Sequence, residues 1–297
     1  MTSQGPRSLA ASALRAEQTR ERHIVDVLIQ ERAPGLLGRP LAGALSRSVL
    51  YPLLNYREAV RVADEMAVRD GLAAMRFLSD WLQLDLQVEQ PEQVPVSGPA
   101  LVVSNHPTGI ADGVVVFDAL SPVRDDLMVL ANRDAVRIAP GLGEVIIPVE
   151  WKPDLRTRAR TRETLHCTQQ AFRDERLVVV FPSGRLAYMD QGRLRERPWM
   201  ATAVSLARRH GVPVVPMHIE GRNSRLFYTF SRLSEQLRDI TLFHEVLNKR
   251  QGSYRVRFGE PIPPEALDGD SEEVTRRLQA HVESGLRIPF GESGSGD

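Results

Sequence analysis

Residues 99–120 read PALVVSNHPTGIADGVVVFDAL, and this stretch decides how the chain folds. Its first part, up to Ser104, is apolar and β-branched, which is typical of a strand covered on both faces of a sheet. A short polar loop follows, and the apolar residues VVVFDAL then indicate a buried helix. A strand that leads through a loop into a helix is the repeating unit of parallel α/β sheets.

Five other stretches have the same apolar, β-branched composition, and helical stretches separate most of them. The predicted strands are DLMVLA (126–131), EVIIPV (144–149), RLVVVF (176–181), VPVVPMHI (212–219) and YRVRF (254–258). Helical patterns cover about 154–175, 198–210 and 271–287. We therefore predict an α/β domain over residues 91–288, with a largely parallel mixed sheet flanked by helices.

The part before this domain has a helical pattern instead. Apolar stripes with helical spacing occur at Val25, Leu28 and Ile29, and again at Val60, Ala63, Ala67, Met75, Leu78 and Leu82. We assign residues 13–90 to an N-terminal helical segment. Its middle, residues 33–54, is apolar with interspersed arginines, which suits either a lipid headgroup layer or a buried hairpin that covers the main domain. Residues 1–12 and 289–297 are small and polar, and we expect both to be disordered.

Composition narrows the classes of partner and compartment. The 297 residues include 38 Lys+Arg and 38 Asp+Glu, and this zero net charge argues against nucleic acid as a partner. The single Cys167 excludes an intramolecular disulfide and a cysteine-based zinc site, fits a reducing cytoplasm, and is expected to be a half-buried core thiol. We see neither a run of about 20 apolar residues nor a signal peptide, so we expect peripheral contact with the inner face of the cell membrane.

The loop after the first strand carries the candidate chemistry. His106 follows the strand directly and can present its imidazole to a cleft, while Asp112 lies a few residues on, at the start of the helix. A carboxylate that accepts a hydrogen bond from one ring nitrogen fixes the tautomer and makes the other nitrogen a better base. Alternatively, Asp112 only caps the helix and His106 is a turn histidine, and the spacing alone does not decide between these alternatives.

Two more polar clusters follow predicted strands. Ser183, Gly184 and Arg185 follow RLVVVF, where backbone N–H groups and a guanidinium can form an anion site. His218 and Glu220 share one face of a later strand, but nothing else supplies metal ligands at a recognisable spacing. We therefore expect neither a metal nor another cofactor.

Five blocks in this order resemble the lysophospholipid acyltransferase family, which includes 1-acylglycerol-3-phosphate acyltransferase. They are NHPTGIADG (105–113), ANRDAVRIAPGLGEVIIPV (131–149), FPSGR (181–185), VPVVP (212–216) and YRVRFGEPIP (254–263). The first block has one residue more between His and Asp than the family's N-H-x-x-x-x-D. It is similar to the NHPxGxxDG of the hemolysin-like branch, the lyso-ornithine or glycine lipid O-acyltransferases. Ser183 stands where the family usually has Glu, and Arg185 is displaced by one position.

This resemblance implies a glycerol-3-phosphate acyltransferase-like fold and a role for each block. His106 would act as general base, oriented by Asp112, on the hydroxyl of a lysolipid acceptor such as lysophosphatidic acid or a lyso-aminolipid. The acyl donor would be acyl carrier protein or acyl-CoA, with oxyanion donors among the N–H groups around Gly184. The implied substrate-binding residues are Asn105, Gly109, Arg133, Ser183, Gly184, Arg185 and Arg222.

Three other functions compete with this one. A thioester or lipid hydrolase would use the same His–Asp pair on water, and a non-catalytic module would bind lipid or an acyl carrier without turnover. The presence of both His106 and Asp112 argues against the module, because a degenerate site needs neither. A nucleotide-binding protein is disfavoured because no GxGxxG or GxxxxGK[ST] follows any strand.

Overall fold

The computed structural model describes residues 22–37, 48–150, 153–287 and 289–290. The predicted disordered ends lie outside this range, apart from Pro289 and Phe290. So does the centre of the apolar stretch 33–54, residues 38–47. All structural statements below concern the described residues.

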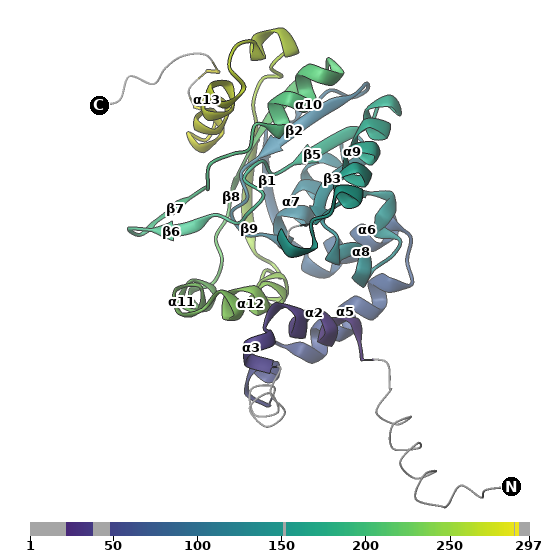
Figure 1. The fold of residues 1–297 in the computed structure, drawn as a ribbon, viewed down its shortest axis with the longest axis vertical. Coiled ribbons are helices and arrows are strands. Elements are labelled where there is room, and N and C mark those ends of the chain that lie inside the picture. Colours follow the sequence, from purple (N-terminus) through teal and green to yellow (C-terminus); the bar gives the residue numbers. More distant parts are fainter. Residues whose placement is uncertain (1–21, 38–47, 151–152, 288, 291–297) are drawn as a thin grey trace, which may run out of the picture.

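A seven-stranded sheet forms the centre of the described chain (Figure 1), in the order β1-β9-β8-β2-β5-β3-β4. Its strands are β1 (Asp85–Glu89), β2 (Ala100–Ser104), β3 (Leu127–Asn132), β4 (Ile146–Val149), β5 (Leu177–Val180), β8 (Val214–Glu220) and β9 (Ser253–Phe258). Only β8 and β9 pair antiparallel, and the other neighbours are parallel. The predicted largely parallel mixed sheet is confirmed, and each of the six predicted strands is present.

Helices cover both faces of the sheet, as the composition of the strands predicts. The helices are α2 (Ile24–Arg32), α3 (Pro34–Leu37), α5 (Tyr56–Ala67), α6 (Gly71–Leu82), α7 (Ile110–Leu120), α8 (Asp134–Ile138), α9 (Arg158–Arg173), α10 (Thr202–His210), α11 (Arg225–Leu233), α12 (Glu235–Leu247) and α13 (Ser271–Glu283). Successive residues of β2 alternate between the two cores. Val102 packs with α6 and α7, while Leu101 and Val103 pack with α9, α10 and α13.

Three parts of the fold were not predicted. Strand β1 has the polar, edge-strand composition DLQVE and pairs in parallel with β9, so the sheet begins before the predicted boundary at residue 91. A small hairpin, β6 (Tyr188–Asp190) and β7 (Arg193–Arg195), follows β5 and projects to the left in Figure 1. Helices α11 and α12 follow β8 and pack against each other.

The N-terminal helices form a third core with α12, at the lower end of Figure 1. Val25 and Ile29 are buried there, which confirms the first predicted helical stripe. A buried ion pair links this part to the sheet domain, because Arg32 Nη2 lies 2.8 Å from Asp134 Oδ2 on α8. Within the described residues, no helix is both long and apolar enough to cross a bilayer.

The direction of the strands determines where the site lies. Strands β2, β3, β4, β5 and β8 run parallel, so the loops that follow them gather at one edge of the sheet. Ligands of open α/β sheets bind at this carboxyl edge. The loops that begin at Asn105, Phe181 and Gly221 therefore bring the predicted polar clusters into one region.

Candidate active site

His106 and Asp112 form a hydrogen-bonded pair at the carboxyl end of β2. His106 Nδ1 lies 2.8 Å from Asp112 Oδ2, so the additional residue between them does not separate the two side chains. Asp112 is the third residue of α7 and is fully buried, while 20% of the His106 side chain is exposed. A carboxylate only accepts hydrogen bonds, which places the proton on Nδ1 and leaves Nε2 as the acceptor.

Asp112 also caps α7, the helix of which it is the third residue. Its carboxylate accepts the N–H groups of Thr108 at 2.9 Å and Gly109 at 2.8 Å, together with the Thr108 hydroxyl. Gly109 has φ 89°, and a Cβ there would lie 2.6 Å from Leu186 Cδ2, so this turn requires glycine. The Asp112 carboxylate thus both caps α7 and bonds the ring of His106, so these two roles are not alternatives.

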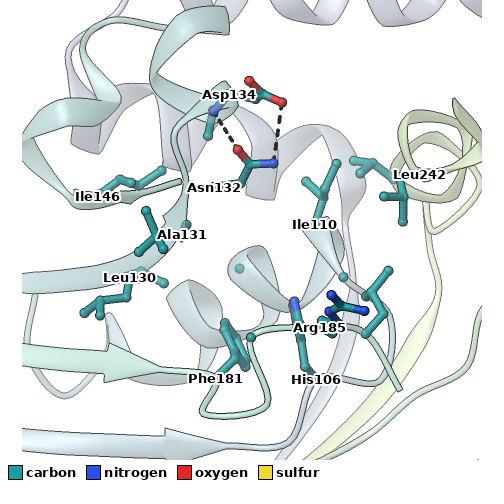
Figure 2. A pocket seen from close by; sticks show the side chains of 18 of the residues that line it. His106, Ile110, Leu130, Ala131, Asn132, Asp134, Ile146, Phe181, Arg185 and Leu242 are labelled. Atoms are coloured by element: carbon teal, nitrogen blue, oxygen red, sulfur yellow. Dashed lines mark hydrogen bonds between the residues drawn. The ribbon is translucent and has the colours of Figure 1, made fainter. Parts of the chain in front are cut away.

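The imidazole of His106 faces a large cavity (Figure 2), stacked on Phe181 with ring centroids 4.2 Å apart. The cavity has a volume of about 1310 Å³. Its walls are mostly apolar and come from α7 (Ile110, Gly113, Val114, Phe117), from β3 and β4 (Leu127, Val129, Ala131, Ile146) and from α6 (Leu72, Met75, Leu78). The four α7 residues have i, i+3, i+4, i+7 spacing and therefore line one face of the helix. This space is large and apolar enough to hold a fatty acyl chain.

The backbone of His106 is held by the segment between β5 and α10. Its N–H donates to Glu196 Oε1 at 3.0 Å, and its carbonyl accepts the N–H of Ala187 at 2.9 Å. The other oxygen of Glu196 accepts the Trp199 indole N–H at 3.3 Å, and burial raises the pKa of this carboxyl. The sequence did not identify Glu196, because one acid within RLRERPW has no distinguishing pattern.

The predicted residues after β5 reach the same cavity. The Ser183 hydroxyl donates to the Arg185 carbonyl at 2.7 Å, and the Gly184 N–H donates to the Phe181 carbonyl at 2.9 Å. The Gly184 N–H is therefore used inside the turn. Arg185 lies beside His106 (Figure 2) and lines the cavity. Neither its guanidinium nor its backbone N–H is paired with another described residue.

The other predicted binding residues lie apart from the cavity or are already engaged. The Asn105 side-chain amide bonds the backbone of Ile219 in both directions, at 2.9 and 2.8 Å, and so joins the ends of β2 and β8. Arg133 pairs with Glu163, and Arg222 is exposed, and neither lines the cavity. Basic side chains that do line the cavity, besides Arg185, are Arg32, Arg156, Arg160, Arg197, Arg232 and Arg238.

His218 and Glu220, considered for a metal, lie on β8. Burial lowers the pKa of the His218 imidazole. Across the described part of the chain, no three His, Cys, Asp or Glu side chains come together as metal ligands.

Part of the chain matches a known protein family. Residues 85–220 match the family model described as Acyltransferase. The chain is similar to the lyso-glycine lipid O-acyltransferase of Phocaeicola vulgatus, 25% identical over 67% of this chain and 71% of that protein. It is equally similar to the enzyme of that name from Bacteroides thetaiotaomicron, 25% identical over 74% of this chain and 82% of that protein. A solved structure, the 1-acyl-sn-glycerophosphate (LPA) acyltransferase PlsC from Thermotoga maritima, aligns with 91% of this chain and 100% of its own at 18% identity and a TM-score of 0.47. Residues 85–220, which contain both His106 and Asp112, therefore belong to the acyltransferase family of enzymes.

Proposed function

We propose that the protein moves a fatty acyl group from an acyl thioester to the hydroxyl of a lysolipid, with His106 as general base. The observation that carries this proposal is the 2.8 Å pair of His106 and Asp112 beside an apolar cavity of about 1310 Å³. Two relatives are named lyso-glycine lipid O-acyltransferases, which supports an O-acyl transfer to a lysolipid here.

The reaction needs one base and no covalent enzyme intermediate. Nε2 of His106 takes the proton of the acceptor hydroxyl as its oxygen attacks the thioester carbonyl. The Asp112 carboxylate stabilises the imidazolium that forms. When the tetrahedral intermediate collapses, the C–S bond breaks, and the imidazolium returns the proton to the leaving thiolate. The backbone N–H of Arg185, which has no partner among the described residues, is the candidate donor to the oxyanion, since the N–H of Gly184 is engaged.

The donor is acyl carrier protein or acyl-CoA. Arg158 and Arg162 support the carrier protein, because they lie one turn apart on the exposed side of α9 and have no ion pair with any described residue. Arg156 and Arg160 of the same region line the cavity. A convex basic helix face beside the cavity suits an acidic protein surface better than a small nucleotide.

The acceptor is lysophosphatidic acid or a lyso-aminolipid, approached at the inner face of the cell membrane. Arg185 is the candidate for an anionic headgroup, because its guanidinium lines the cavity beside His106 without a described partner. Val49 and Leu53, which are 61% and 44% exposed, support a peripheral apolar contact of the N-terminal segment with lipid. Flotation with neutral and anionic liposomes tests this contact, and binding that requires anionic lipid would contradict it.

The test of the function is acyl transfer from radiolabelled acyl carrier protein or acyl-CoA to a panel of lysolipids. Wild type is compared with His106→Ala, and His210→Ala, half-buried at the C-terminal end of α10 and outside the cavity lining, is the matched control. We expect a labelled diacyl product that is lost in H106A and kept in H210A. Free fatty acid as the only product would instead indicate the hydrolase. Equal turnover by wild type and H106A would refute the role of His106.

A further inference from the structure

Glu196 is a buried carboxyl that the proposed reaction does not use, although it touches the residue that the reaction depends on. It lies after the β6–β7 hairpin, remote in sequence from His106, and accepts the backbone N–H of His106 at 3.0 Å. Burial alone would favour a neutral or apolar residue at this place, since it raises the pKa of the carboxyl. Keeping an acid here needs a reason beyond packing.

The contacts of Glu196 supply that reason. One carboxylate oxygen accepts the His106 N–H, and the other accepts the indole N–H of Trp199. The backbone N–H of Trp199 in turn donates to the side chain of Gln279 on α13. Ala187, on the same segment between β5 and α10, donates to the His106 carbonyl. Both backbone groups of His106 are therefore fixed by this segment, while Asp112 fixes only the ring.

We infer that Glu196 is a positioning residue for acyl transfer, which fixes the backbone of His106 so that Nε2 points at the acceptor hydroxyl. The inference rests on the proposed role of His106 as the base. Without the carboxylate, the His106 N–H loses its acceptor while the bond from Ala187 to the His106 carbonyl remains, so the backbone of His106 is held at one group instead of two. Displacement of a reacting group by about 1 Å costs on the order of 10²-fold in rate.

Three variants separate this role from general packing. Glu196→Ala removes the acceptor. Glu196→Gln keeps an oxygen that can accept the His106 N–H. Its amide N–H then faces the indole N–H of Trp199, and two donors cannot form a hydrogen bond with each other. Adding Trp199→Phe to E196Q removes the second donor, and W199F alone is its baseline. Asp190→Ala on β6 is the control, because Asp190 lies in the same segment and pairs with the exposed Arg195.

The measurements are kcat and KM for both substrates, with thermal unfolding to select variants that are folded. We expect E196A to lower kcat by about 30- to 100-fold while each KM changes less than about threefold. E196Q with W199F should recover to within about fivefold of W199F alone, because the bond to the His106 N–H is restored. D190A should match wild type.

A folded E196A with wild-type kcat would overturn the inference, as would a loss confined to KM. Failure of the E196Q/W199F pair to recover would also overturn it, because the hydrogen bond would then not be the operative contact. These outcomes differ from failure of the proposed function, in which H106A itself remains active.

Discussion

Asp112→Asn separates the two functions of one carboxylate, helix capping and activation of His106. Asn has nearly the same size, and with its oxygen at the Oδ2 position it still accepts the bonds of His106, Thr108 and Gly109. Its amide nitrogen then faces the Thr108 hydroxyl, which can turn to accept. The loop should therefore keep its geometry, and what is lost is the negative charge.

The contacts give the expected sizes of the two effects. A hydrogen bond to a charged group is about twice as strong as a neutral one, so each bond to Asp112 should lose roughly 0.5–1 kcal/mol. Over the four bonds to Asp112, D112N should then lower the free energy of unfolding by about 2–4 kcal/mol and leave the enzyme folded at 25 °C. The rate should fall by about 10²–10⁴-fold, the usual contribution of a positioned base, because a neutral partner stabilises the imidazolium poorly.

The assay is kcat for acyl transfer by D112N and wild type, with urea unfolding of both. Asp112→Ala is the comparison, since it strands four buried donors and should destabilise far more than D112N. If a folded D112N kept more than about a third of the wild-type kcat, the carboxylate would only cap the helix, and the proposed mechanism would be refuted.

Three other perturbations follow from the structure. Gly113 lines the cavity and has open space where a Cβ would be. A leucine there should exclude the end of a long acyl chain, at a cost of about 0.8 kcal/mol per excluded methylene. Gly113→Leu should therefore lower kcat/KM for palmitoyl donors about tenfold or more and leave octanoyl donors unaffected. Gly143→Leu, which lies outside the cavity, is the control, and equal loss with both chain lengths would contradict the acyl-chain assignment. Burial raises the pKa of Asp118, so the stability that it contributes is present below its unfolded pKa and lost as the pH rises through the folded pKa. Asp118→Asn should therefore raise Tm at neutral pH and leave it unchanged well below the unfolded Asp pKa of about 3.9. The same difference at both pH values would argue against this cause. Arg158→Glu with Arg162→Glu should raise KM for acyl carrier protein about tenfold without affecting acyl-pantetheine, and an equal effect on both donors would exclude carrier docking on α9.

The sequence by itself determined the class of the fold and located the candidate His–Asp pair. Strands such as ALVVS and LVVV are apolar on both faces, which is typical of a sheet covered on two sides, and the helical stretches between them favour parallel neighbours. His106 and Asp112 are six residues apart on one strand–loop–helix unit, so local geometry was enough to bring them together.

The tertiary structure alone decided which distant groups reach His106. Strand β1 has polar edge composition, and its partner β9 lies far along the chain, so no local period predicts their pairing. Glu196 and the apolar face of α6 meet the site only because separate loops and helices fold against the same edge of the sheet. The sequence does not distinguish between the three predicted arginines, Arg133, Arg185 and Arg222. In the structure Arg185 lines the cavity, and the other two do not. Local propensity acts over a few residues, whereas the position of a side chain in a cavity depends on long-range packing. The sequence could therefore predict the His106–Asp112 pair, while the residues that surround this pair became known only from the structure.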